Sequence, residues 1–246
     1  MISRNDPAAE EVRVASAKID ATLYDQALAD LKSTLTRHPG SASTPNAYLL
    51  IGSIYERQAR PDDAMASYVE LRSKFGTTPV APVATFRLGD LTIRSKRDDR
   101  DRAALALFDE VVTRYPNSTW APRALVRKAA IEERAKLRVV DAAMGAVPSA
   151  LVSYRLLTTT YPKAEGAEAA FAELADLYDN LKRYELAAET WQGLATQFPD
   201  NARDAAWRAA ELYGKRVKNV EKARAAYALV PARSGHYGDA QRKLRP

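Results

Sequence analysis

The side chains best suited to acid–base or metal chemistry are sparse in this sequence. It has two histidines, His38 and His236, and no cysteine. His38 comes directly before Pro39, in a position that other segments fill with Tyr or Phe, and His236 lies in the C-terminal tail. A catalytic triad or a zinc site needs a histidine beside further ligands or acid–base partners, and neither position provides that setting.

Neighbouring carboxylates are the other candidates for acid–base work. Adjacent residues of a helix point in different directions, so such pairs are better explained as solvated faces or turns. The pairs are Asp62 with Asp63, Asp98 with Asp99, and Glu132 with Glu133. The sequence also has no Gly-rich phosphate loop, no HExxH segment and no EF-hand loop. We therefore expect a protein that is not an enzyme, with no catalytic residue, no cofactor and no metal site.

A repeated segment explains where many of the apolar residues stand. Each copy has an alanine, a large apolar residue four positions later, and a Pro or Gly twelve positions after the alanine. Residues four apart share one face of a helix, and Pro or Gly ends the helix. The alanines are Ala27, Ala64, Ala104, Ala150, Ala187 and Ala223; the large residues are Leu31, Tyr68, Phe108, Tyr154, Trp191 and Tyr227; the stops are Pro39, Gly76, Pro116, Pro162, Pro199 and Gly235.

A second helix is expected before each of these segments. Gly52 and Tyr55 precede Ala64 by twelve and nine residues, and Ala175 and Tyr178 precede Ala187 by the same spacing. Small residues let two helices cross closely. The sequence therefore predicts an all-α stack of about six antiparallel helix pairs in one domain, residues 1–246. The expected units are 8–39, 45–76, 81–116, 121–162, 166–199 and 202–235, followed by a C-terminal cap at 236–246.

This order of small residue, aromatic, alanine, aromatic and proline resembles the tetratricopeptide repeat. The resemblance implies a right-handed superhelical solenoid that acts as a protein-interaction scaffold and holds a partner segment on its concave face. The long period and the Tyr-Pro or Phe-Pro ends are similar to bacterial envelope proteins, namely outer-membrane-assembly lipoproteins and the Tol-Pal-associated periplasmic coordinator. An alternative function that this likeness leaves open is an accessory envelope subunit that binds glycan or membrane-associated material.

The resemblance places the binding groove on the first helix of each pair. Counting from the small residue, the candidate partner-binding residues are Leu49, Ser53, Phe86, Asp90, Val126, Asp176, Trp207 and Glu211. This surface is apolar with scattered acids, so it predicts a protein partner that offers a peptide or helix segment and is not acidic. The Lys and Asn residues that clamp a carboxylate in chaperone-binding members are absent from these positions.

The basic residues are concentrated near the C-terminus. The net charge is +6, and residues 203 to 246 hold eleven Lys or Arg against four Asp or Glu. Such a cluster could meet phosphates or an anionic membrane surface. We favour the solvated face of a terminal helix instead, because acidic residues interleave, and we do not expect nucleic-acid binding.

Two segments, SKRDDRDR and LRVVDAAMGAVPS, lengthen their units. Insertions in repeats often lie on the binding face, although a longer helix and a solvated loop explain these two equally well. No stretch reaches the ~18 consecutive apolar residues of a membrane span. The start, MISRNDPAAE, lacks a secretory signal. We therefore expect a periplasmic or envelope-associated protein if a targeting segment has been removed, and a cytoplasmic one otherwise.

Overall fold

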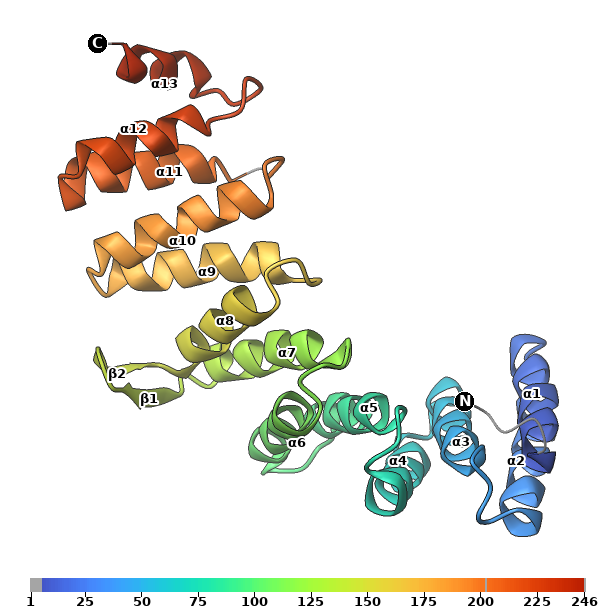
Figure 1. Ribbon diagram of the computed structural model, residues 1–246. Helices are drawn as coiled ribbons and strands as arrows, with labels where there is room; N and C mark the ends of the chain where they lie inside the picture. The colour runs from blue at the N-terminus through green and yellow to red at the C-terminus, as the bar shows by residue number, and fades with distance from the viewer. Residues whose placement is uncertain (1–5, 202, 246) are drawn as a thin grey trace. The chain divides into compact units, whose positions relative to one another are not determined.

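The computed structural model describes residues 6–201 and 203–245, which fold almost entirely into helices (Figure 1). They form two compact units that divide between Ala124 and Leu125, within α7 (Trp120–Arg134). The N-terminal unit also contains α1 (Pro7–Asp20), α2 (Tyr24–Arg37), α3 (Thr44–Arg57), α4 (Pro61–Phe75), α5 (Ala81–Arg94) and α6 (Arg100–Arg114). The C-terminal unit also contains β1 (Arg138–Asp141), β2 (Gly145–Pro148), α8 (Ser149–Thr160), α9 (Ala167–Asn180), α10 (Tyr184–Gln197), α11 (Ala205–Leu212), a π-helical segment (Tyr213–Val217), α12 (Val220–Ala228) and α13 (Tyr237–Leu244).

Consecutive helices form the predicted pairs, so the all-α helical-repeat fold is confirmed. The pairs are α1 with α2, α3 with α4, α5 with α6, α7 with α8, α9 with α10, and α11 with α12. That the whole chain is one domain stays a prediction. The expected bounds at 202 and 246 fall outside the described residues.

The predicted Tyr-Pro and Phe-Pro stops end the second helix of a pair by one mechanism. His38, Tyr115, Tyr161 and Phe198 each follow a helix with φ near −130° and ψ between 49° and 73°. Each is followed by a proline, whose ring excludes the helical conformation from the preceding residue. The carbonyl of each then accepts a hydrogen bond from the amide three residues on, at 2.9 to 3.2 Å. The helix therefore ends at this residue, and a hydrogen-bonded turn of the connecting loop follows it.

Five of the six turns inside the pairs share a different geometry. Thr22, Ala59, Lys136, Lys182 and Lys218 all have φ between 51° and 63°. The amide after each of them donates back to a carbonyl near the end of the first helix, for example Arg183 to Tyr178 at 2.8 Å. This is the left-handed C-terminal cap that glycine fills most easily. None of these five positions holds a glycine.

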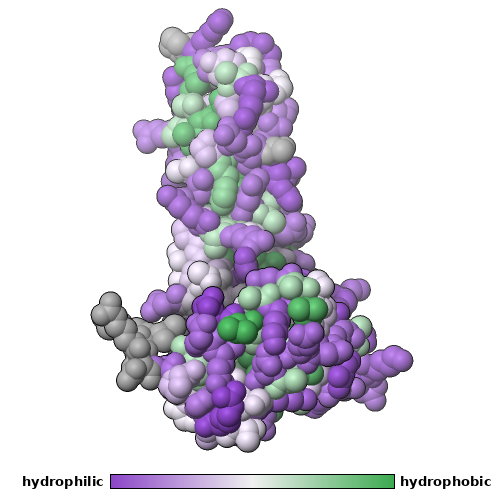
Figure 2. Space-filling view, turned by 90° about the vertical axis from the view of Figure 1, so that its right-hand side faces the viewer, coloured by the Kyte–Doolittle hydropathy of each residue, from purple (hydrophilic) through white to green (hydrophobic). Residues whose placement is uncertain are grey.

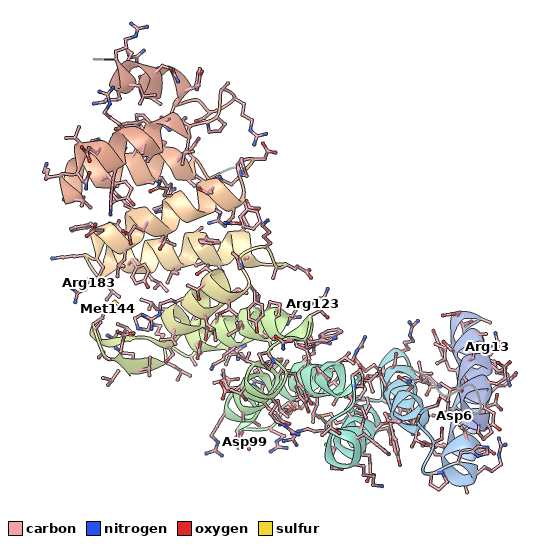
Figure 3. The ribbon with its side chains drawn as sticks, in the orientation of Figure 1. Asp6, Arg13, Asp99, Arg123, Met144 and Arg183 are labelled. Carbon is pink, nitrogen blue, oxygen red and sulfur yellow. The ribbon has the colours of Figure 1, made fainter. Side chains whose placement is uncertain are left out.

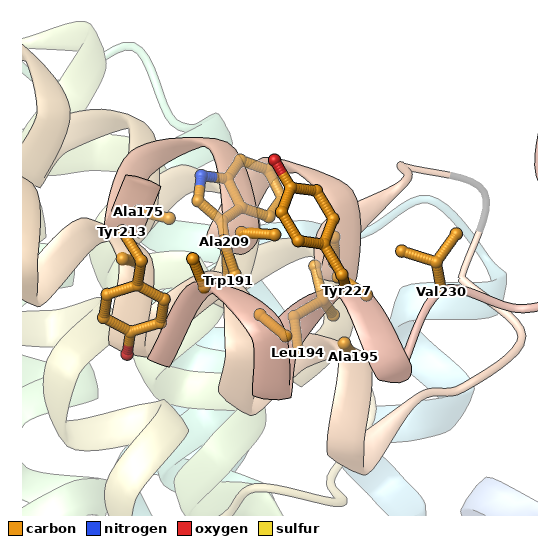
Figure 4. Packing of buried hydrophobic residues seen from close by; sticks show 14 of the residues in the cluster. Ala175, Trp191, Leu194, Ala195, Ala209, Tyr213, Tyr227 and Val230 are labelled. Atoms are coloured by element: carbon orange, nitrogen blue, oxygen red, sulfur yellow. The ribbon is translucent and has the colours of Figure 1, made fainter. Parts of the chain in front are cut away.

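The alanine and aromatic stripe is the core, as predicted. All six alanines of the stripe are at most 5% exposed, and all six large residues are at most 8% exposed. Gly52 shows how closely two helices cross, because a Cβ built there would lie 2.4 Å from the ring of Tyr68. In the C-terminal unit the same pattern brings Ala175, Trp191 and Tyr213 together in one cluster (Figure 4). Much of the face seen in Figure 2 is hydrophilic, with apolar residues in small groups among the polar ones.

The sixth pair contains an extra residue. Tyr213 begins the π-helical segment and precedes Ala223 by ten residues, whereas Tyr55 and Tyr178 precede their alanines by nine. A π-helical turn holds one residue more than an α-helical turn. The extra residue lets Tyr213 reach the core, where it is 1% exposed and its hydroxyl lies 3.1 Å from Gln192 Oε1.

The insertion LRVVDAAMGAVPS forms an antiparallel β-hairpin rather than a longer helix and a loop. Val139 pairs with Val147, and Val140 pairs with Ala146. Val147 is fully buried, whereas Val140 is 80% exposed. Asp141 accepts a hydrogen bond from Arg155 of α8 at 2.7 Å, so the hairpin is fastened to the helix that follows it.

Proline is expected to break the last long helix at Pro231, and the helix does end before it rather than at the repeat stop Gly235. α12 ends at Ala228, and Pro231 follows after Leu229 and Val230. The predicted cap at 236–246 contains α13, which lies against α12. Ala240 is its buried residue, at 0% exposed, while Tyr237 is 37% exposed. The cap therefore covers the core through Ala240 and the partly buried Leu244, rather than through Tyr237.

Candidate binding site

A cleft of about 610 Å³ opens in the N-terminal unit at the turn ends of α3, α4 and α5. The connection between α5 and α6 runs from residue 95 to 99, whereas that between α3 and α4 runs only from 58 to 60. The longer connection supplies one wall. The lining residues are Glu56, Ala59, Pro61, Asp62, Met65, Leu91, Arg94, Ser95 and Lys96.

A hydrogen-bond network fixes one side of the cleft. Glu56 accepts hydrogen bonds from the Tyr68 hydroxyl at 2.5 Å and from Arg87 at 3.0 Å. Burial and then the bond to Glu56 raise the pKa of Tyr68 above its usual value, so the hydroxyl remains a donor. Arg87 balances the charge of Glu56. This wall is therefore preorganised without carrying an uncompensated charge.

The rest of the lining combines an apolar surface with a charged rim. Met65 is half-buried, and Leu91 is 7% exposed. Asp62 stands at the start of α4, and Lys96 stands in the longer turn. Clefts with apolar walls and a few polar groups suit an apolar side chain of a ligand. The cleft has no histidine or cysteine with which to do acid–base or metal chemistry.

Two of the predicted groove residues lie on faces that lead into this cleft. Ser53 is three residues before Glu56 on α3, and Asp90 is four residues before Arg94 on α5. Residues with these spacings share a helical face. Asp90 lies 3.9 Å from the Arg94 guanidinium, so its charge is partly balanced. Leu49, one turn before Ser53, packs against the core of the N-terminal unit.

The predicted groove aromatics are used mainly for packing. Phe86 is 7% exposed, with the rings of Phe108 and Trp120 centred 5.5 and 4.9 Å away. Trp207 stacks on His236 with centroids 4.6 Å apart and also contacts Tyr227. Because these neighbours come from elements that lie later in the chain, counting along the first helix alone did not reveal them.

The remaining predicted residues have partners within the C-terminal unit. Val126 packs against Gly166. A Cβ built on Gly166 would lie 2.7 Å from the Cγ2 atom of Val126. Asp176 is exposed and lies 3.6 Å from Arg208. Glu211 accepts from the Tyr227 hydroxyl at 2.7 Å and pairs with Lys215. Burial alone would raise the pKa of Glu211, but these bonds lower it, so its carboxylate is charged at neutral pH.

Each histidine has a single carboxylate neighbour, which the sequence did not predict. His38 lies 3.5 Å from Glu11, and His236 lies 4.0 Å from Asp204. Ser234 donates to Asp204 at 2.6 Å, so its hydroxyl is not directed at the imidazole as a triad requires. Over residues 6–201 and 203–245, no three His, Asp or Glu side chains are grouped to hold a metal ion, and no helix is long and apolar enough to cross a membrane.

Residues 169–201 match the family model described as a tetratricopeptide repeat. They span α9, α10 and the turn between them, including Ala175, Ala187 and Trp191 of the predicted stripe. The α9–α10 pair therefore matches a tetratricopeptide repeat. Comparison with curated protein sequences gives no significant match.

Solved structures of three bacterial proteins share this helical-repeat fold. PilF of Pseudomonas aeruginosa is 15% identical, with a TM-score of 0.51 over 96% of this chain and 97% of that one. A tetratricopeptide repeat protein from Parabacteroides merdae is 15% identical, with a TM-score of 0.54 over 96% and 97%. The C-terminal part of a Cytophaga hutchinsonii repeat protein is also 15% identical, with a TM-score of 0.56 over 99% and 90%. At this identity the likeness establishes the fold alone.

Proposed function

We propose that this protein is a non-catalytic interaction scaffold that binds a segment of a protein partner in the cleft between α3, α4 and α5. The cleft is the observation that carries the proposal, because it joins an apolar surface to a prearranged polar wall. The faces that carry Ser53 and Asp90 would extend the contact along the first helices. Tetratricopeptide-type repeats typically bind peptide segments on such surfaces.

The preferred partner segment carries an apolar side chain and is not acidic. An apolar anchor would contact Met65 and Leu91, and Asp62 on the rim would repel a neighbouring carboxylate. Lys96 on the opposite rim weakens this charge preference, so the apolar anchor is the main determinant. We further propose a place in the bacterial cell envelope, supported by the likeness of the long repeats and their Tyr-Pro ends to envelope proteins.

The test is a charge placed on the apolar lining. Met65→Glu should weaken binding of the captured partner by about tenfold or more, because an apolar contact is replaced by a buried carboxylate. The matched control is Val69→Glu on the same helix, since Val69 is 45% exposed and outside the cleft. Affinity capture from the native organism identifies the partner, and titration with both variants measures the effect. Equal weakening by the two variants, or by neither, would reject the cleft as the site.

A further inference from the structure

The C-terminal unit gathers cations without carboxylate partners along one edge. This edge, called the turn edge, comprises residues 135–148, 181–186 and 214–220, where each first helix passes to the second. Five of the ten Lys and Arg residues among the last forty residues pair with a carboxylate, for example Lys222 with Glu185 and Glu189 at 2.9 and 3.1 Å. Among the described residues, six turn-edge cations lie within 4.0 Å of no carboxylate: Lys136, Arg138, Lys182, Arg183, Arg216 and Lys218.

The turn edge is continuous across three consecutive turns. Asp141 of the hairpin binds Arg155, which also contacts Tyr178, and the Tyr178 carbonyl accepts from the Arg183 amide. Figure 3 shows Met144 of the hairpin and Arg183 at this same edge. A shallow hollow of about 400 Å³ then joins Arg183 to Arg216. Two carboxylates lie within the turn edge, and both are paired: Asp141 with Arg155, and Glu185 with Lys222. The exposed carboxylates of the adjoining helix ends, Asp179 and Glu221, are fewer than the six cations.

Exposed aliphatic side chains stand among the cations. Val140 on the outer face of the hairpin is 80% exposed, and Val220 at the start of α12 is 69% exposed. Leu137, Val139 and Leu186 are between 38% and 41% exposed. These five residues are most of the exposed large hydrophobic residues of this unit. The others are Leu156, Leu229 and Tyr237. Apolar and cationic groups are therefore exposed on the same edge.

The lysines of the turn edge occupy positions that are unfavourable for them. Lys136, Lys182 and Lys218 have φ of 51°, 57° and 63°, the left-handed conformation that favours glycine. The equivalent positions of the N-terminal unit hold the uncharged Thr22 and Ala59. All five positions therefore carry the same backbone strain, but only the three turns of this edge place a positive charge there.

We propose that the turn edge binds an anionic lipid bilayer, with the cations at the headgroups and the β-hairpin inserted among the acyl chains. Lys and Arg are attracted to anionic lipid surfaces, and exposed aliphatic groups gain by leaving water. A nucleic acid fits less well, because single strands are held by exposed aromatic stacking platforms, whereas the exposed groups here are aliphatic. A protruding hairpin flanked by dispersed charges also suits a planar surface better than a shaped pocket.

The experiment measures co-sedimentation of the full chain with vesicles. The protein should bind phosphatidylcholine vesicles that contain phosphatidylglycerol, bind pure phosphatidylcholine vesicles at least about tenfold more weakly, and release as salt is raised. Lys182→Glu with Arg183→Glu should reduce binding at least about tenfold. The control pair, Lys163→Glu with Arg233→Glu, lies in the turns at the opposite ends of the helices and should bind like the wild type.

Two further variants separate the apolar and structural contributions. Val140→Asp should weaken vesicle binding by about three- to tenfold, whereas Leu229→Asp, an exposed apolar position away from the turn edge, should not. Lys182→Gly should raise the denaturation midpoint yet weaken binding, which a purely structural role for Lys182 would not produce. The proposal is overturned if both vesicle types bind equally, if the control pair has the same effect as the turn-edge pair, or if only oligonucleotides or polyglutamate bind.

Discussion

Small residues in this chain are requirements of helix packing. Gly52 has no room for a methyl group, because its place is taken by the Tyr68 ring. That ring is fully buried and its hydroxyl is held by Glu56, so it cannot move aside freely. The closeness of α3 and α4 therefore depends on the absence of one side-chain carbon.

Gly52→Ala tests this directly. We expect it to lower the free energy of unfolding by about 1–3 kcal/mol, because the ring must shift in a filled core. Gly40→Ala is the matched control, since a Cβ at Gly40 would meet nothing within 4 Å. Urea denaturation followed by circular dichroism compares the two. A loss in both variants of the same size would contradict the steric explanation.

The individual residues also show what a sequence can and cannot reveal about a site. The alanine stripe was predictable because burial imposes the spacing of a helical face. Phe86 and Trp207 were interpreted as groove residues, but Phe108 and His236 cover them from elements that lie later in the chain. The cleft residue Met65 lies on a second helix, which the groove prediction did not search. The lengthened segment SKRDDRDR was the sequence signal for the cleft, because its Ser95 and Lys96 form part of the lining.

At the scale of single elements, the turns within pairs contain a backbone conformation that lowers the stability of the protein. Ala59 adopts φ of 55° between α3 and α4, a conformation that its side chain disfavours. The turn survives because the flanking helices pack and because the Arg60 amide donates to the Tyr55 carbonyl at 2.9 Å.

Ala59→Gly should therefore stabilise the protein by about 0.5–1 kcal/mol, since glycine removes the steric cost at a helix C-terminus. Ala66→Gly in the middle of α4 is the opposite control, because it should destabilise by about 1 kcal/mol. Thermal denaturation of the two variants beside the wild type gives the sign of each effect. A lower midpoint for Ala59→Gly would show that the left-handed turn is not strained.

Two elements escaped prediction for different reasons. The hairpin had a signal, because Val139 and Val140 precede the turn and Val147 follows Gly145, as in β-branched strands around a glycine turn. The π-helical segment had a signal only in its spacing, since Tyr213 precedes Ala223 by ten residues instead of nine, while the composition of YGKRV differs little from that of an α-helical turn. The π-helical turn is stabilised by the packing of Tyr213 against the preceding helix pair, which is a tertiary contact.

At the scale of the whole molecule, a stack of repeats needs a cover at its end. The last pair buries Ala226, Tyr227 and Val230, and α13 lies against it with Ala240 fully buried. Without α13 this apolar face would meet water.

Ala240→Glu should detach α13 and lower the free energy of unfolding of the C-terminal unit by about 1–3 kcal/mol, because a carboxylate cannot be buried there unpaired. Gln241→Glu, at the exposed neighbouring position, should be nearly neutral. Guanidinium denaturation monitored by tryptophan fluorescence suits this test, since Trp207 stacks on His236 just before α13. An unchanged transition for Ala240→Glu would mean that the stack needs no such cover.

The β-hairpin also has a consequence for how the chain folds. α7 and α8 are separated by residues 135–148, whereas α9 and α10 are separated by residues 181–183. Bringing the ends of the longer connection together costs about 1 kcal/mol more chain entropy. The hairpin removes most of this cost if it forms first, because the Ser149 amide then donates to the Leu137 carbonyl at 2.9 Å. Only Ala135 and Lys136 then remain between α7 and the closed hairpin. A hairpin that forms early therefore brings α7 and α8 together, although an unstructured insertion of the same length would delay their packing.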